Sequence, residues 1–268
     1  MAEPAIWHVK GRHNTLYLLG TIHMLRNDEP LPDNIGRAYR EAEQLLMEID
    51  LDDMDPIAAQ VLTLKLGMQP AGRTLESQLD ADTNRKLHTA TDDLGLDAGM
   101  LSPFQPWLAA LTLEQLQLAR LGLAADSGIE MQLMQQAARD HKPIHGLETL
   151  EQQLSLFANM DDRAQLDYLK LTLTELETAP AELETLLAAW RNGDERQLSQ
   201  ALQQGFMDDP KLFAALTTAR NRRWLSVIKP LLDQQQDDYL VAVGALHLIG
   251  NEGLVTLLRR AGYTVTRQ

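Results

Sequence analysis

Two histidines follow the same pattern near opposite ends of the chain. An apolar run ends at Gly20 and His23 lies three residues later, and a second apolar run ends at Gly244 with His247 three residues later. Short uncharged runs of this kind are typical of buried strands, and a glycine lets the backbone turn sharply where a strand ends. Open α/β sheets place ligands and catalytic groups at such strand ends. We therefore expect both imidazoles at one edge of a sheet.

Two glutamates end further apolar segments. Glu48 follows the run 45–47, and Glu148 follows the short segment 143–147. A strand–helix–strand unit connects the strand before His23 to the strand before Glu48, which predicts that these two side chains are neighbours. An acid on a buried strand requires a charged or metal partner. Two imidazoles with one or two carboxylates could bind a divalent ion and leave positions for water and substrate. The alternative is that each histidine only forms a hydrogen bond in a partly buried loop.

Arg220 lies within an apolar stripe on a predicted helix. The stripe has steps of three and four residues and consists of Phe213, Leu216, Arg220, Trp224, Val227 and Leu231. A buried guanidinium needs a carboxylate partner or an anionic ligand or transition state, whereas an arginine at the margin of the stripe would extend to solvent. Both interpretations of Arg220 are open. The Ser-x-x-Glu spacing of Ser127 and Glu130 indicates a capping box that begins another helix.

The hydrophobic periods predict an α/β fold. It has a central mixed sheet of five or six strands and large helical insertions that form a cap or second lobe. A hairpin is expected over residues 5–20. The expected single domain spans 1–268, with sheet segments at about 5–50, 142–149 and 237–268 and helical insertions at about 55–140 and 150–236.

Composition excludes several classes of protein. The 268 residues carry a formal net charge of −14, which disfavours nucleic acid as a partner. No apolar stretch is long enough to insert across a bilayer. There is no cysteine, and so there is neither a thiolate metal site nor a cysteine nucleophile. The chain also lacks the glycine-rich nucleotide motifs, the His-Glu-x-x-His motif and the Gly-x-Ser-x-Gly elbow.

Six ordered motifs resemble those of the TraB/GumN family, which includes the TIKI proteases. They lie at residues 19–23, 47–50, 127–130, 146–149, 220–224 and 244–250, and the resemblance extends over nearly the whole chain. One departure is Glu130, where the family pattern leads us to expect aspartate. The resemblance implies a divalent-metal-dependent peptidase and a core similar to erythromycin esterases and ChaN-like haem-binding lipoproteins. Manganese or cobalt is the metal that the resemblance favours, although zinc or iron also suits nitrogen and oxygen ligands.

Carried over to this sequence, the resemblance gives each motif residue a role. His23, Glu48 and His247 bind the ion, Arg220 stabilises the oxyanion, and Glu148 moves protons or completes the metal shell; which glutamate is ligand and which is base stays open. The expected substrate is a peptide or protein. The alternatives are a non-catalytic protein that binds a peptide or haem, and a metal-independent hydrolase of the erythromycin-esterase type. The resemblance also favours an exported, periplasmic protein whose leader has been removed, with a cytoplasmic location left open.

Overall fold

The computed structural model describes residues 3–26, 29–50, 54–204 and 210–268. The chain divides into two compact units. Unit 1 comprises residues 1–53, 124–149 and 184–268, and unit 2 comprises 54–123 and 150–183. Helical insertions were expected at about 55–140 and 150–236. Of these segments, residues 124–140 and 184–236 belong to unit 1 together with the sheet, and the remainder lies in unit 2.

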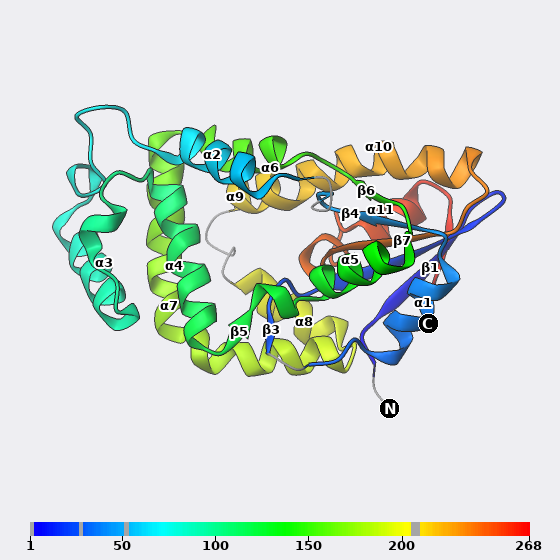
Figure 1. The fold of residues 1–268 in the computed structure, drawn as a ribbon. Helices are drawn as coiled ribbons and strands as arrows, with labels where there is room; N and C mark the ends of the chain where they lie inside the picture. Colours follow the sequence, from blue (N-terminus) through cyan, green and yellow to red (C-terminus); the bar gives the residue numbers. More distant parts are fainter. Residues whose placement is uncertain (1–2, 27–28, 51–53, 205–209) are drawn as a thin grey trace. The chain divides into compact units, whose positions relative to one another are not determined.

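Unit 1 contains a mixed six-stranded sheet in the order β6-β4-β7-β2-β1-β8, which confirms the expected fold class. Figure 1 labels four of these strands, β6, β4, β7 and β1. Strands β6, β4, β7 and β2 run parallel to one another, whereas β1 pairs antiparallel with both β2 and β8. Their bounds are β1 Ile6–Lys10, β2 Thr15–Thr21, β4 Gln44–Met47, β6 Ile144–Gly146, β7 Tyr239–Gly244 and β8 Thr264–Arg267. The short strands β3 (Leu25–Arg26) and β5 (Leu123–Ala124) form a separate pair.

The sequence explains this sheet directly. The predicted hairpin over residues 5–20 is confirmed, with Trp7 opposite Leu18 and Val9 opposite Leu16. Side chains alternate between the two faces of a strand. These four residues belong to one buried cluster together with residues of the two helices α10 (Ala219–Gln234) and α11 (Leu254–Arg260), such as Trp224. Both helices therefore pack on the same face of the sheet.

The remaining helices of unit 1 connect the strands. They are α1 (Asp33–Glu41), α5 (Ile129–Asp140), α8 (Glu195–Gln204) and α9 (Pro210–Phe213), and a π-helical turn, Ala214–Thr218, leads from α9 into α10. The predicted stripe around Arg220 is partly wrong. Trp224 is buried, but Val227 is exposed and Ile228 and Leu232 are buried instead. Along α10 the buried stripe runs in steps of four residues after Arg220, whereas the predicted stripe took a step of three after Trp224.

Unit 2 is helical. Its helices are α2 (Pro56–Gly67), α3 (Ala81–Leu94), α4 (Pro106–Arg120) and α6 (Leu150–Ala158), while α7 (Asp162–Arg191) contributes residues to both units. Trp107 of α4, Phe157 of α6 and Tyr168 of α7 form a series of ring contacts in its core. In the part of the chain that is described, no helix combines the length and the low polarity needed to cross a membrane.

Candidate active site

The parallel strands bring the sequence motifs to one edge of the sheet. Strands β2 and β7 are neighbours, with Thr21 opposite Gly244, so His23 and His247 both follow this edge. Strand β4 lies on the other side of β7, and Glu48 follows it directly. The backbone N–H of Glu148 donates to the backbone carbonyl of Glu48 at 2.9 Å, which brings the second glutamate to the same edge.

Arg220 is buried and contacts Glu48, Glu148 and His247. Its Nε and Nη2 donate to Oε1 of Glu148 at 2.9 and 2.5 Å, and Nη2 also donates to Oε2 of Glu48 at 2.5 Å. Nη1 contacts Nε2 of His247 at 2.9 Å and donates to the carbonyl of Leu216 at 3.2 Å. A guanidinium has five N–H donors, and all five have partners here. The interpretation of Arg220 as a buried arginine with carboxylate partners therefore holds, and that of a residue extending to solvent is wrong.

His247 is buried and neutral, and it accepts a hydrogen bond from Arg220. Burial lowers the pKa of His247 to about 3. A neutral imidazole has one donor and one acceptor nitrogen. The Nδ1 atom lies 2.7 Å from Oδ1 of Asn221, whose amide nitrogen is bound to the backbone carbonyls of His247 and Glu252. Nδ1–H is therefore the donor to Asn221, and Nε2 accepts from Arg220. The His247 ring and the Arg220 guanidinium both lie against the ring of Trp224, with centres 4.4 and 4.6 Å from it.

His23 has a different environment, because its side chain is 66% exposed and contacts Glu130. Nδ1 of His23 lies 2.6 Å from Oε1 of Glu130, and the same carboxylate oxygen accepts from the hydroxyl of Thr21. The Glu130 carboxylate raises the pKa of His23 to about 9. Burial opposes ionisation of Glu130, but the charge of His23 and the hydrogen bonds from His23 and Thr21 lower its pKa.

The capping-box interpretation of residues 127–130 is therefore wrong. Helix α5 begins after Gly128, which is its N-cap and makes no side-chain capping hydrogen bond. A Cβ atom at Gly128 would lie 2.1 Å from the backbone carbonyl oxygen of His23, so the absent side chain lets α5 begin directly against the His23 segment. This close approach carries Glu130 to the imidazole.

Gly244 leaves room between two potential ligands. A Cβ atom at this position would lie 3.2 Å from both Oε1 of Glu48 and Nε2 of His23. The backbone N–H of Gly244 also donates to Oε1 of Glu48 at 2.8 Å. An imidazole nitrogen and a carboxylate oxygen thus border the same small space at the end of β7.

The charges around Glu48 keep it ionised although it is buried. Burial acts to raise the pKa of Glu48, but the surrounding His247, Arg220 and His23 and the hydrogen bond from Gly244 lower it below its usual range. Among these groups Arg220 makes the direct charged contact. Two guanidinium groups contact Glu148: Nη2 of Arg220 lies 2.5 Å from its Oε1, and Nη2 of Arg223 lies 3.7 Å from its Oε2.

The residues fit a divalent metal in part. Within the described ranges, no three or more His, Cys, Asp or Glu side chains are grouped so that they could hold a metal ion. Nε2 of His247 lies 3.8 Å from Oε1 of Glu48 but accepts from Arg220, and the metal-ligand role of His247 stays a prediction. By contrast, His23 and Glu48 meet at Gly244, and Glu130 binds the other ring nitrogen of His23, as carboxylates commonly do behind metal-binding histidines.

Sequence reasoning gave no site role to Glu130, Asn221 or Arg223. Glu130 and Asn221 lie inside motifs that carry the family resemblance, and this position in the motifs was the signal that could have identified them as site residues. Glu130 was instead interpreted as part of a helix-capping box. Arg223 lies off the predicted apolar stripe, and sequence spacing does not show that its side chain reaches Glu148.

Comparison with known protein families identifies the chain's relatives. The model of the TraB/PrgY/gumN family matches residues 5–267. The chain belongs to this family. The TraB/PrgY/gumN match covers every residue of the site, from Thr21 to His247.

Individual TraB/PrgY/gumN relatives differ in how closely they resemble the chain. The uncharacterized protein YbaP of Escherichia coli (strain K12) is 30% identical over 257 residues, which cover 96% of this chain and 92% of YbaP. Metalloprotease TIKI2 of Xenopus tropicalis is 25% identical over 311 residues, covering 97% of this chain and 59% of TIKI2. Metalloprotease TIKI1 of Homo sapiens is 25% identical, with 97% of this chain and 61% of TIKI1 covered. No solved structure matches the chain.

Proposed function

We propose that this protein is a divalent-metal-dependent hydrolase that cleaves peptide bonds at the edge of its sheet. The observation that supports this most strongly is the placement of His23 Nε2 and Glu48 Oε1 around Gly244, with Glu130 behind the imidazole. The similarity to proteins named metalloproteases agrees with it. Because those relatives are distant and longer than this chain, the peptide substrate is part of the proposal.

His23 and Glu48 are the residues that would hold the ion. Glu130 binds the Nδ1 side of the ring, so Nε2 is the nitrogen that faces Gly244. The negative charge of Glu130 favours a positive charge on this imidazole, and either a proton or a metal ion supplies one. A bound divalent ion would lower the pKa of a water molecule and polarise a substrate carbonyl. Hard and borderline donors such as these suit manganese, cobalt, zinc or iron.

Arg220 organises the site and does not act on the substrate directly. Since all five of its N–H donors have protein partners, it has none left for a substrate oxyanion. It fixes the orientation of Glu48 and compensates the charges of Glu48 and Glu148. This differs from the oxyanion role that the sequence suggested. The proton-transfer role of Glu148 stays a prediction.

A metal-dependence experiment tests the proposal. Protein freed of metal with a chelator is supplied with Mn²⁺, Co²⁺, Zn²⁺ or Fe²⁺ and incubated with a mixed peptide library whose products are read by mass spectrometry. We expect cleavage that depends on the added ion and is lost in His23→Ala and Glu48→Gln. Arg222→Gln is the matched control, because Arg222 lies on α10 near the site but pairs with Glu252.

Other outcomes separate the competing functions. Tight binding of intact peptides without cleavage would favour a binding protein. Cleavage of ester or amide substrates that persists at full rate in the chelator would favour metal-independent hydrolysis through the same His and Glu residues. Either result would overturn the proposed metal-dependent reaction.

A further inference from the structure

The structure assigns to Arg223 the recognition of a substrate carboxylate beside the reacting bond. This inference rests on the proposed peptidase function and adds a specificity determinant to it. It makes Arg223, and not the buried Arg220, the arginine that contacts the substrate.

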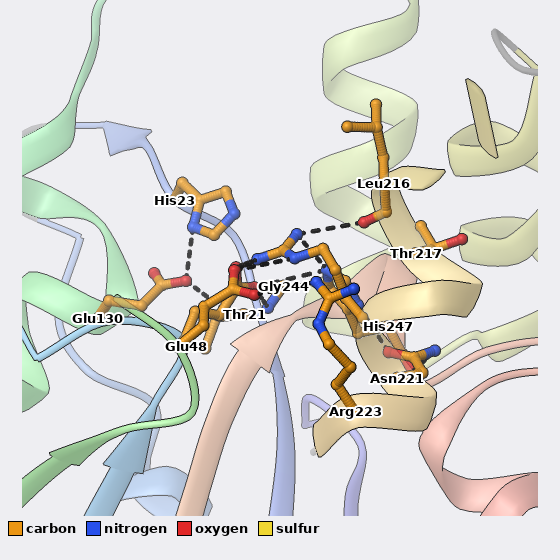
Figure 2. Close-up of polar contacts among 12 residues, drawn as sticks. Thr21, His23, Glu48, Glu130, Leu216, Thr217, Asn221, Arg223, Gly244 and His247 are labelled. Atoms are coloured by element: carbon orange, nitrogen blue, oxygen red, sulfur yellow. Dashed lines mark hydrogen bonds and ion pairs between the residues drawn. The ribbon is translucent and has the colours of Figure 1, made fainter. Parts of the chain in front are cut away.

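The first observation is the geometry of Arg223. It lies one helical turn after Arg220 on α10, and its side chain extends toward the acidic cluster (Figure 2). Nη2 lies 3.7 Å from Oε2 of Glu148, which is an ion-pair distance beyond that of a hydrogen bond. The side chain is 52% exposed while that of Glu148 is 3% exposed, so Arg223 links the buried acids to solvent.

The second observation is the contrast with the neighbouring arginines. Arg220 has five bonded donors, and Arg222 donates to Glu252 at 2.9 Å. Over the described segments, the guanidinium of Arg223 has one ion pair, with Glu148, and donates no hydrogen bond. A planar guanidinium with unused donors binds a carboxylate in a bidentate manner.

The third observation is the charge of the cluster. Glu48, Glu130 and Glu148 bring three carboxyl groups to the edge of the sheet; Glu130 pairs with His23, whereas Glu48 and Glu148 share the one guanidinium group of Arg220. Two acids that share one cation leave negative charge at this place, which would repel an anionic substrate. Arg223 adds a positive charge at the exposed side of Glu148, where it can offset this repulsion and bind the anion at the same time. A carboxylate is the anion that a peptide carries, at its C-terminus or on an aspartate or glutamate side chain.

Matched peptides test the inference. Three forms of one cleaved peptide are compared: a free C-terminal carboxylate, a C-terminal amide, and an amide with an aspartate replacing a neutral residue next to the cleaved bond. For Arg223→Gln we expect KM to rise about tenfold for the forms with a carboxylate, with kcat changed less than twofold and the neutral amide unaffected. Preference for one of the two carboxylate forms identifies whether the chain end or an acidic side chain is bound.

Two further variants separate the effect of the Arg223 charge from that of its bidentate geometry and provide a control. Arg223→Lys keeps the charge and loses the bidentate fork, so its KM should lie between those of the wild type and Arg223→Gln. Arg222→Gln should match the wild type with all three peptides. An equal loss of kcat for charged and neutral peptides in Arg223→Gln would overturn the inference, because it would indicate action on the reaction through Glu148.

A binding measurement keeps this test separate from that of the proposed function. The affinities of an N-acetylated dipeptide acid and of its amide are measured by calorimetry with the full chain, wild type and Arg223→Gln. Preference of the wild type for the acid, lost in Arg223→Gln, supports carboxylate recognition even if no peptide is cleaved. Equal affinity of the wild type for acid and amide overturns it even if peptides are cleaved.

Discussion

At the scale of single residues, hydrogen bonds between charged groups set the arrangement of the site. Arg220 holds two glutamates and a neutral histidine through donors that are all engaged. His23 keeps a nitrogen toward Gly244 because Glu130 binds its other side. The two histidines have equivalent places in their sequence motifs, but His247 accepts a hydrogen bond from Arg220 and His23 borders the space at Gly244.

Removing the Arg220 charge should destabilise the protein. Arg220→Met leaves Glu48 and Glu148 buried without their main cation, and breaking a buried ion pair of this kind costs about 3 to 5 kcal/mol. Urea unfolding of the variant and the wild type measures the difference. The triple variant Arg220→Met, Glu48→Gln, Glu148→Gln should recover part of the loss. A change below about 1 kcal/mol in Arg220→Met would contradict the central role of this guanidinium.

Changing Glu130 should weaken metal binding with little effect on the fold. Glu130→Gln keeps the size of the side chain but removes the charge behind His23, and loss of such a supporting carboxylate lowers metal affinity about 10- to 100-fold. Glu130→Asp should retain more of the affinity, because it keeps the carboxylate. Titration with Mn²⁺ followed by electron paramagnetic resonance measures this without substrate. Unchanged affinity in Glu130→Gln would mean that His23 is not a ligand.

At the scale of elements, the sequence predicted positions better than side-chain directions. Apolar periodicity located the strands before His23, Glu48, Glu148 and His247, and parallel pairing explains why they share an edge. The directions depend on the backbone turn after each glycine. A short 3-10 helix (Ala245–His247) turns His247 inward, and no repeat in the sequence indicates this. Likewise, the partners of Arg220 and Glu130 come from distant segments, which local patterns do not reveal.

The end of β7 gives an element-scale prediction. Gly244 has φ −49° and ψ 137°, which alanine also adopts, so Gly244→Ala should fold normally. Its Cβ would lie 3.2 Å from the ends of two side chains, Glu48 and His23, and would fill the space between them. We expect peptide cleavage to fall at least about tenfold while the melting temperature stays within a few degrees. Full activity in Gly244→Ala would place the reaction elsewhere.

Gly20 provides the matched comparison, because the atom nearest to an added Cβ there belongs to the backbone. A Cβ at Gly20 would lie 3.0 Å from the Cα of Ala245, where the two glycine–histidine segments pack together. Backbone atoms cannot move aside as side-chain ends can. Gly20→Ala should therefore lower the free energy of unfolding by about 1 to 3 kcal/mol, measured by urea unfolding. Equal behaviour of the two glycine variants would contradict this distinction.

At the scale of the whole molecule, the site belongs to unit 1 and unit 2 has acids of its own. The carboxyl group of Glu114 is held by the hydroxyls of Tyr168 and Thr172, at 3.1 and 2.7 Å. Burial raises the pKa of Glu114. Burial, together with the charges of Glu114 and Glu182, also raises the pKa of Glu175, to about 7. In a chain with net charge −14, unit 2 therefore carries a group of acids that favour protonation.

This group should make unit 2 more stable in mild acid. The folded state holds a proton on Glu175 that the unfolded chain releases near its ordinary pKa of 4.5, so the stabilisation is complete below pH 4.5 and is lost as pH rises through 7. Glu175→Gln removes this dependence. Relative to the wild type, the variant should gain on the order of 1 kcal/mol of unfolding free energy between pH 5 and 8, after allowance for partial exposure of the side chain. Urea unfolding at both pH values measures it, with the exposed Glu177→Gln as the control that should show no such gain. The prediction is contradicted if the unfolding free energies of Glu175→Gln and the wild type differ by the same amount at pH 5 and at pH 8. Glu175 would then have the same pKa in the folded and the unfolded chain, and unit 2 would tolerate its buried charges without protonation.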